Sequence, residues 1–241
     1  MGSERSFGRS AGQIRPITFK RGFTASPAGS CLVSTGKTTV LCTVSVVPGV
    51  PQWMAGKGLG WVTAEYSMLP GSTQQRKPRE IAKGKPEGRT QEIQRLVGRA
   101  LRSVMDMKNL GENTLWADCD VLEADGGTRT ASVNGAYVAL HDALKWMEKR
   151  QMLFKWPLTG AVSAISVGIV ADVPLVDLDY SEDSKAQVDM NVVATSDDRL
   201  IEVQGTGEKR PFSQAELDKL MELARDGVRQ VRQAQEAALA S

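Results

Sequence analysis

Apolar residues occur along this chain in short extended runs, separated by polar turns. The run 38–47 (TTVLCTVSVV) is rich in β-branched residues and predicts a buried strand. Gly36 and Lys37 precede it and predict a hairpin turn after a strand at 30–34. The same criteria predict further strands at 14–21, 61–66, 115–122, 161–170, 176–178, 187–194 and 200–204.

Other segments repeat apolar residues with the period of an α-helix. They predict three long helices, at about 90–107, 131–149 and 214–238. Thr90 is suited to cap the first helix, and Ser213 with Glu216 forms a capping box for the last one. Strands that alternate with helices predict a layered α/β (α+β) fold. Because no linker-like stretch divides residues 1–241, we expect a single domain.

The segment 69–88 differs from its surroundings. It is polar, rich in Gly, Pro, Lys and Arg, and lacks any apolar period. We therefore predict a long exposed loop. Loops of this length are uncommon inside compact domains and are usually functional or disordered.

The scarcity of histidine narrows the possible chemistry. With one histidine among 241 residues, a multi-histidine metal site is excluded, and we expect His141 on a helix surface without a catalytic role. Cys31, Cys42 and Cys119 have no metal-type spacing and are expected as buried strand residues, as in a reducing compartment. The chain has no signal-like N-terminus and no apolar stretch near 18 residues, so we expect a cytoplasmic protein without a membrane span.

The net charge of +2 conceals two opposed segments. Residues 71–109 carry ten basic and four acidic side chains, whereas residues 172–198 carry eight acidic side chains and one basic. Basic side chains bind phosphates and carboxylates bind hard divalent cations, so the two segments together suit a polyanion site with a metal. The alternative is that both are solvated surface, which is the usual state of a charge run.

Two short motifs could bind an anion at the start of a helix. Gly126, Gly127, Thr128 and Arg129 precede the second predicted helix, where free N–H groups, a hydroxyl and a guanidinium would meet a phosphate. Arg89 has the same position before the first helix. The alternative for both is an ordinary turn that starts a helix.

Two further pairs of residues are candidates for chemistry or binding. Asp183 and Asp189 could meet across a turn to hold Mg²⁺ or to act in acid–base catalysis, although an acidic surface turn is the alternative. Trp53 and Trp61 are typical packing residues that could also stack on nucleobases.

Several long motifs, in this order, resemble the ribonuclease PH family of bacterial phosphate-dependent 3′→5′ exoribonucleases, which mature tRNA ends. The resemblance covers essentially the whole chain and rests on WVTAEYSMLP (61–70), GRTQEIQRL (88–96), DCDVLEADGGTRTAS (118–132), SVGIV (166–170), DSKAQVDMNVV (183–193) and IEVQG (201–205). It implies a ribosomal-protein-S5-domain-2-like fold. It also implies a ring-shaped homohexamer built as a trimer of dimers.

The resemblance also assigns roles to individual residues. It implies a phosphate site made by Arg89, Gly127, Thr128 and Arg129. It implies a pair, Asp183 and Asp189, for catalysis and for binding Mg²⁺ or Mn²⁺. It implies RNA contacts from the loop residues Arg76 and Arg79, and RNA or subunit contacts from Arg95, Arg99 and Arg102, which share one helix face. Many members have arginine where this chain has Gly71, so one loop contact is absent.

The implied reaction uses inorganic phosphate as co-substrate. Phosphate would attack the 3′-terminal phosphodiester of tRNA precursors and other RNA with single-stranded 3′ ends, and nucleoside diphosphates would leave. The reverse reaction would make the enzyme a tRNA nucleotidyltransferase. No DNA or membrane partner is implied. Two alternatives stay open: a hydrolytic, metal-dependent exoribonuclease and a non-catalytic RNA-binding ring subunit.

Overall fold

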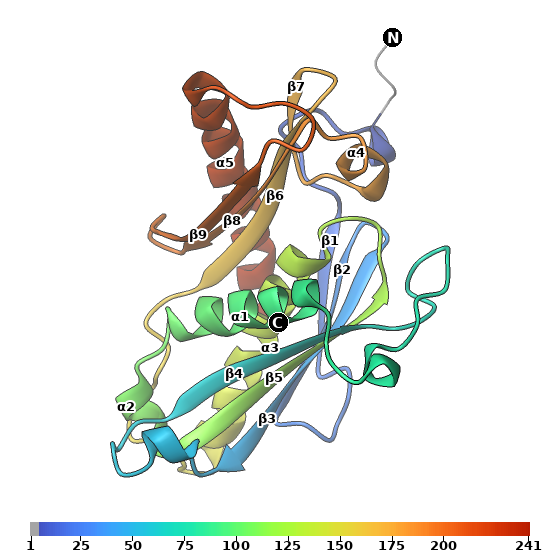
Figure 1. The fold of residues 1–241 in the computed structure, drawn as a ribbon. Coiled ribbons are helices and arrows are strands. Elements are labelled where there is room, and N and C mark those ends of the chain that lie inside the picture. The colour runs from blue at the N-terminus through green and yellow to red at the C-terminus, as the bar shows by residue number, and fades with distance from the viewer. Residues whose placement is uncertain (1–4) are drawn as a thin grey trace.

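The computed structural model describes residues 5–241, except for the side chains at positions 81 and 83, and contains two β-sheets (Figure 1). The first sheet has the order β1-β2-β3-β5-β4 and is antiparallel except that β4 runs parallel to β5. Its strands are β1 Ile17–Arg21, β2 Gly29–Thr35, β3 Thr38–Pro48, β4 Trp61–Met68 and β5 Asn113–Glu123. The β2–β3 register joins Thr35 to Thr38, which confirms the predicted hairpin.

The second sheet is antiparallel and has the order β7-β6-β8-β9. Its strands are β6 Val162–Val170, β7 Val173–Val176, β8 Val188–Thr195 and β9 Leu200–Thr206. The α-helices are α1 Gly88–Arg102, α2 Met107–Leu110, α3 Thr128–Lys149, α4 Tyr180–Asp183 and α5 Gln214–Ala240. Three 3-10 turns complete the structure, η1 Ser6–Gly8, η2 Gln52–Met54 and η3 Glu80–Lys83.

The helices cover the sheets in layers. In Figure 1 the first sheet lies at the bottom, with α1 above it and α3 passing behind it, and the second sheet lies at the top with α5 against it. Strand β3 alternates buried and partly exposed residues because only one of its faces is covered. Strand β6 is buried almost throughout because α3 and α5 both pack against it. The predicted mixed α/β fold is therefore confirmed, and none of the helices between residues 5 and 241 is long and apolar enough to cross a membrane.

Two predicted elements end differently in the structure. The first helix stops at Arg102 instead of about residue 107, because Met105 turns away to form an isolated bridge with Leu158. The strand predicted at 176–178 instead ends at Val176, because Asp177 adopts a left-handed backbone (φ 54°). The first change follows from a tertiary contact of an apolar residue and the second from the backbone conformation of Asp177.

The predicted loop 69–88 is mostly irregular and exposed, but it is not structureless. It contains η3, and Ser72 at its base is 3% exposed. The N–H of Ala124 donates to Ser72 O at 2.8 Å, so one end of the loop is fixed to the segment after β5. The three cysteines are buried in strands, as predicted.

Strand β2 crosses α3 so closely that position 29 requires glycine. A Cβ on Gly29 would press against Ala139 O and lie 2.6 Å from Ala143 N, and backbone atoms of a helix cannot move aside. We expect Gly29→Ala to lower the free energy of unfolding by about 3 kcal/mol or more, and thermal unfolding should show a Tm roughly 6–12 °C lower. Gly12→Ala is the control, because its Cβ would meet only Leu223 Cδ2 at 3.8 Å, and its Tm should match the wild type. Equal stability of the two variants would contradict the close approach.

Candidate active site

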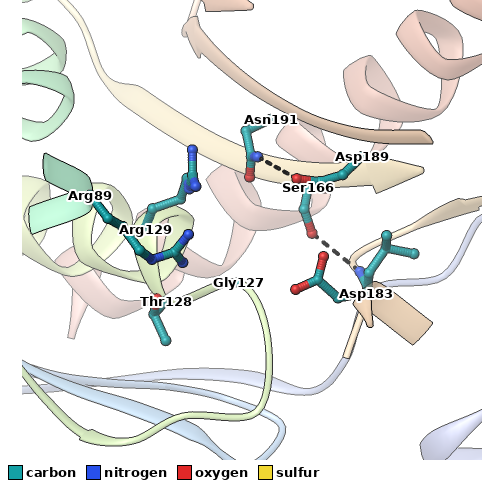
Figure 2. Close-up of a pocket in the computed structure, with 9 residues that line it drawn as sticks. Arg89, Gly127, Thr128, Arg129, Ser166, Asp183, Asp189 and Asn191 are labelled. Carbon is teal, nitrogen blue, oxygen red and sulfur yellow. Dashed lines mark hydrogen bonds between the residues drawn. The ribbon is translucent and has the colours of Figure 1, made fainter. Parts of the chain in front are cut away.

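Residues from five separate segments of the chain line one cavity of about 50 Å³, which is enough for several water molecules or a small oxyanion (Figure 2). The lining residues are Arg89, Gly127, Thr128, Arg129, Ser166, Leu178, Asp183, Asp189 and Asn191. All six residues that the sequence singled out for phosphate binding and catalysis are among them. Their convergence is a property of the tertiary structure, because they come from α1, α3, α4 and β8.

The glycine turn, residues 125–127, brings the start of α3 to the cavity. Gly126 and Gly127 both have left-handed backbones (φ 77° and 68°). A Cβ on Gly126 would lie 2.7 Å from Leu178 O, so only glycine lets the turn approach this neighbouring backbone. Helix α3 begins at Thr128, and its first N–H groups have no acceptor within the helix. The turn therefore presents free N–H donors and the positive end of the helix dipole to the cavity.

Two arginines lie on one side of the cavity and Asp183 on the other (Figure 2). Arg129 Nη1 donates to Gln204 Oε1 on β9 at 2.8 Å, which orients its guanidinium. Arg89 lies in the first turn of α1 and is exposed. The arrangement offers two planar cations to the same space, as recognition of a phosphate requires.

The two carboxylates of the site have raised pKa values. Burial raises the pKa of Asp189 to about 6, with a further rise from the charge of Asp183. Burial also raises the pKa of Asp183, while the charges of Arg89 and Arg129 oppose this rise. The negative charge of each carboxylate is therefore not balanced by nearby positive charge. This is expected of groups that bind a cation or transfer a proton.

Arginine pairing explains why these two acids differ from their neighbours. Six of the eight acidic residues between positions 172 and 198 form salt bridges with arginines: Asp172, Asp177, Asp179, Glu182, Asp197 and Asp198. Among the described residues, Asp183 and Asp189 are the two acids of this segment without such a bridge. Six acids of this segment therefore serve in salt bridges, which leaves Asp183 and Asp189 as its candidates for binding a cation.

The carboxylates fit a hard divalent cation only as part of a mixed donor set. Across the described chain no group of three or more His, Cys, Asp and Glu residues is arranged for a metal. Asn191 lies beside Asp189, its Nδ2 donating to Oδ2 at 3.4 Å, and Ser166 adds a hydroxyl oxygen. Mg²⁺ is typically bound by one or two carboxylates together with substrate phosphates and water, so this set is chemically suitable.

Three polar residues of the site were missed by the sequence reasoning. Asn191 could have been found, because it follows Asp189 by two positions on the same strand and so shares its face. Ser166 pairs with Asn191 across β6 and β8. Tyr66 supports the site from β4, with its Oη 2.9 Å from Thr128 Oγ1. The last two contacts connect distant segments and leave no signal in one sequence.

The arginines assigned to RNA or subunit contacts have different surroundings. Arg76, Arg79 and Arg95 are exposed. Arg99 forms a salt bridge with Glu202 at 2.6 Å. Arg102 donates to Val62 O at 2.8 Å and lies 4.6 Å from the centre of the Trp61 ring. Arg102 is therefore held against the edge of the first sheet, so the three helix arginines do not form one free face.

The remaining candidates lie away from the cavity. Trp53 is 58% exposed and packs edge-on against Trp61, with ring centres 4.8 Å apart. His141 packs edge-on against Trp156 and does not line the cavity.

The raised pKa of Asp189 predicts that this residue costs stability. Because its folded pKa (about 6) exceeds the ordinary value of 3.8, the folded state loses stability as pH rises from about 4 to 6. Asp189→Asn should therefore raise the free energy of unfolding at pH 7.5 by about 1 kcal/mol, after allowance for solvent screening. This corresponds to a Tm roughly 2–4 °C higher, and the gain should vanish near pH 4.

Asp142→Asn is a matched control of opposite sign. Burial acts to raise the pKa of Asp142, but its hydrogen bonds lower it, with Arg21 Nη2 donating at 2.7 Å. Removal of this charge should lower Tm at pH 7.5. If Asp189→Asn also lowers Tm at that pH, the hypothesis that the charge of Asp189 destabilises the folded state is refuted.

Comparison with known proteins places this geometry in a family. The RNase PH model, described as 3′ exoribonuclease family, domain 1, matches residues 13–145, and the model of domain 2 of the same family matches residues 160–227. Rrp46 of rice (Oryza sativa) has a similar structure, with 18% identity over 98% of this chain and 100% of that chain, and a TM-score of 0.79.

Two archaeal structures are similar in fold as well. An Archaeoglobus fulgidus exosome described with RNA bound to the active site is 22% identical over 96% of this chain and 92% of its own, with a TM-score of 0.79. An archaeal exosome core is 21% identical over 97% of this chain and 91% of its own, with a TM-score of 0.77. The two family models together span most of the sequence, and the chain therefore belongs to the 3′ exoribonuclease family.

Proposed function

We propose that this chain is a phosphate-dependent 3′→5′ exoribonuclease that releases nucleoside 5′-diphosphates. The observation that carries this proposal is the cavity itself. Arg89, Arg129 and the start of α3 lie on one side, and two carboxylates without salt bridges, Asp183 and Asp189, lie on the other. A protein nucleophile is not needed, because positioning and charge stabilisation supply most of the catalysis in such transfers.

Inorganic phosphate binds at the arginines and the glycine turn. One of its oxygens attacks the phosphorus of the 3′-terminal phosphodiester, and the bond from that phosphorus to the 3′-oxygen of the preceding nucleotide breaks. The terminal nucleotide leaves as a diphosphate, and the shortened RNA takes up a proton on its new 3′-oxygen. One of the two carboxyls, Asp183 or Asp189, both with pKa values raised by burial, would deliver that proton. One phosphate ester is exchanged for a phosphoanhydride, and we propose that the reaction is reversible.

We further propose Mg²⁺ or Mn²⁺ as the cofactor. Asp183 and Asp189 would hold the ion, with Asn191 next to them. When bound, the ion supplies positive charge to phosphate oxygens in the transition state. The carboxylates then serve to place that charge opposite the arginines.

The proposed substrates are tRNA precursors and other RNAs with single-stranded 3′ ends. Arg76 and Arg79 lie exposed on the loop that precedes α1, and Arg95 is exposed on α1 itself. These side chains could follow an RNA backbone towards Arg89. We also propose that the chain assembles into a homohexameric ring, a trimer of dimers.

A second candidate is a non-catalytic RNA-binding subunit of a ring. It is favoured by the similarity in fold to Rrp46 and to the archaeal exosome structures. The phosphate and acidic residues in one cavity favour the catalytic proposal, because an inactive subunit does not need them. A hydrolytic exoribonuclease is the third possibility, and its products would differ.

Product analysis with a 3′-extended tRNA distinguishes these functions. We expect nucleoside diphosphates that form only when phosphate is added. Arg89→Ala should raise the phosphate KM about 10- to 100-fold, because a charge-assisted hydrogen bond contributes roughly 1.5–3 kcal/mol. Arg95→Ala, an exposed arginine of the same helix, should leave the phosphate KM unchanged.

Two other outcomes would contradict the phosphate-dependent exoribonuclease. Monophosphates released without phosphate would show hydrolysis. RNA binding without turnover, under any phosphate or metal concentration, would show the non-catalytic subunit.

The tryptophan pair suggests a second RNA contact at the far end of α1. Arg89 begins this helix of 15 residues, and Arg102 at its end packs on Trp61, so the pair lies about 20 Å from the cavity along the helix axis. Lys57 lies 5.8 Å from the ring centre of Trp53, and cations next to exposed indoles are typical of surfaces that stack single-stranded RNA.

Binding of RNAs of different lengths should reveal this contact. Trp53→Ala should weaken binding of a 12-nucleotide RNA about 5- to 100-fold, as loss of one stacked base does, and leave a trinucleotide unaffected. Phe23→Ala is the control, since Phe23 is 41% exposed and follows β1, at the opposite edge of the first sheet from β4 and Trp61. Equal loss for both RNA lengths would contradict a contact remote from the cavity. A change in oligomeric state would assign Trp53 to a subunit interface.

A further inference from the structure

The glycine turn 125–127 is held by a buried arginine from the N-terminal segment. Arg15 is 1% exposed, and its Nη1 donates to Asp125 O at 2.6 Å while Nη2 donates to Gly126 O at 3.4 Å. The same guanidinium binds Asp177 in a bidentate manner, with Nε to Oδ2 at 3.0 Å and Nη2 to Oδ1 at 2.7 Å. Arg15 thus connects the turn before α3 with the segment before α4.

A second buried group fixes the turn from β3. Thr38 is fully buried, and its Oγ1 donates to Gly126 O at 2.7 Å and accepts from the N–H of Asp125 at 2.8 Å. The N–H of Tyr180 in turn donates to Asp125 O at 3.2 Å. The hydroxyl of Thr38 therefore forms hydrogen bonds with both Gly126 O and the N–H of Asp125.

The segments joined in this way carry opposite halves of the cavity. The turn leads directly into Thr128 and Arg129, whereas the segment from Asp177 leads into α4, which ends at Asp183. The N–H of Leu178 donates to Ser166 Oγ at 3.2 Å, which connects the same segment to β6. Neither Arg15 nor Thr38 lines the cavity, so neither contacts a bound phosphate directly.

We propose that Arg15 and Thr38 are positioning residues for the phosphate. Together they hold the N–H groups at the start of α3 at a fixed distance and direction from Asp183. This inference rests on the proposed function and adds that phosphate affinity, rather than the chemical step, depends on these buried contacts. A displaced turn would bind phosphate more weakly, yet saturating phosphate would still fill the site.

Thr38→Val tests this with minimal change of shape. It removes both hydrogen bonds of Thr38 to the turn while Arg15 still holds the turn from the other side. We expect the phosphate KM to rise about 10-fold, with kcat at saturating phosphate within about 3-fold of wild type and the RNA Kd unchanged. Arg15→Lys, which cannot keep the bidentate geometry, should raise the phosphate KM further if it folds.

The control is the neighbouring residue on the same strand. Thr39 Oγ1 lies 3.3 Å from Ser34 Oγ and makes no contact with the turn, so Thr39→Val should leave the phosphate KM unchanged. An unchanged KM in Thr38→Val, or an equal rise in Thr39→Val, would overturn the proposal. A fall in kcat without a change in KM would overturn it too, because it would place Thr38 in the chemical step.

Direct binding separates this inference from the proposed function. The rise of Tm with added inorganic phosphate measures affinity without RNA, metal or turnover. A phosphate-dependent Tm in the wild type that is equally strong in Thr38→Val overturns the positioning role alone. If phosphate does not raise the Tm of the wild type, the proposed function fails, and the positioning role fails with it.

Discussion

The ion pair between Arg15 and Asp177 is the contact on which the geometry of the cavity depends. It is buried, and both partners are fully hydrogen-bonded, with Arg15 bound to segments that lie 110 and 162 positions away in the sequence. Burial acts to lower the pKa of Arg15, but the hydrogen bond and charge of Asp177 raise it above the ordinary value. Such a pair adds little net stability, yet its loss would leave an unpaired charge in the interior. The ion pair fixes the position of the glycine turn relative to α4.

Charge is distributed on this chain by a simple rule. Acids next to the cavity that serve structure are paired with arginines: Arg5 donates to Glu182 at 2.6 Å, one residue before Asp183. Within the described part of the chain Asp183 and Asp189 have no such partner, and burial without a salt bridge raises their pKa values. The surrounding ion pairs keep these two carboxylates in place although they repel each other. A site that binds a cation or a proton needs carboxylates whose negative charge is not already balanced by a salt bridge.

The elements were predictable where local pattern and tertiary environment agree. Strand β3 has β-branched residues and one covered face, and helix α5 has a capping box, Ser213 with Glu216, that the structure contains in full. Prediction was wrong where an apolar residue had a partner elsewhere. Met105 continues the helical pattern of α1, but its bridge to Leu158 ends the helix earlier. A local pattern cannot reveal which of two favourable environments a residue will take.

The sequence by itself determined which residues could form the site. Arginine and glycine before helices, and aspartates spaced around a turn, made Arg89, Gly127 and Asp189 candidates, and the family resemblance assigned their roles without coordinates. Only the tertiary structure decided which charges are free. Asp177 and Asp183 look alike in the sequence, and they differ because Arg15 reaches the first, whereas no arginine among the described residues bridges the second. Pairing depends on distance in space, and a buried arginine from the N-terminal segment sets that distance.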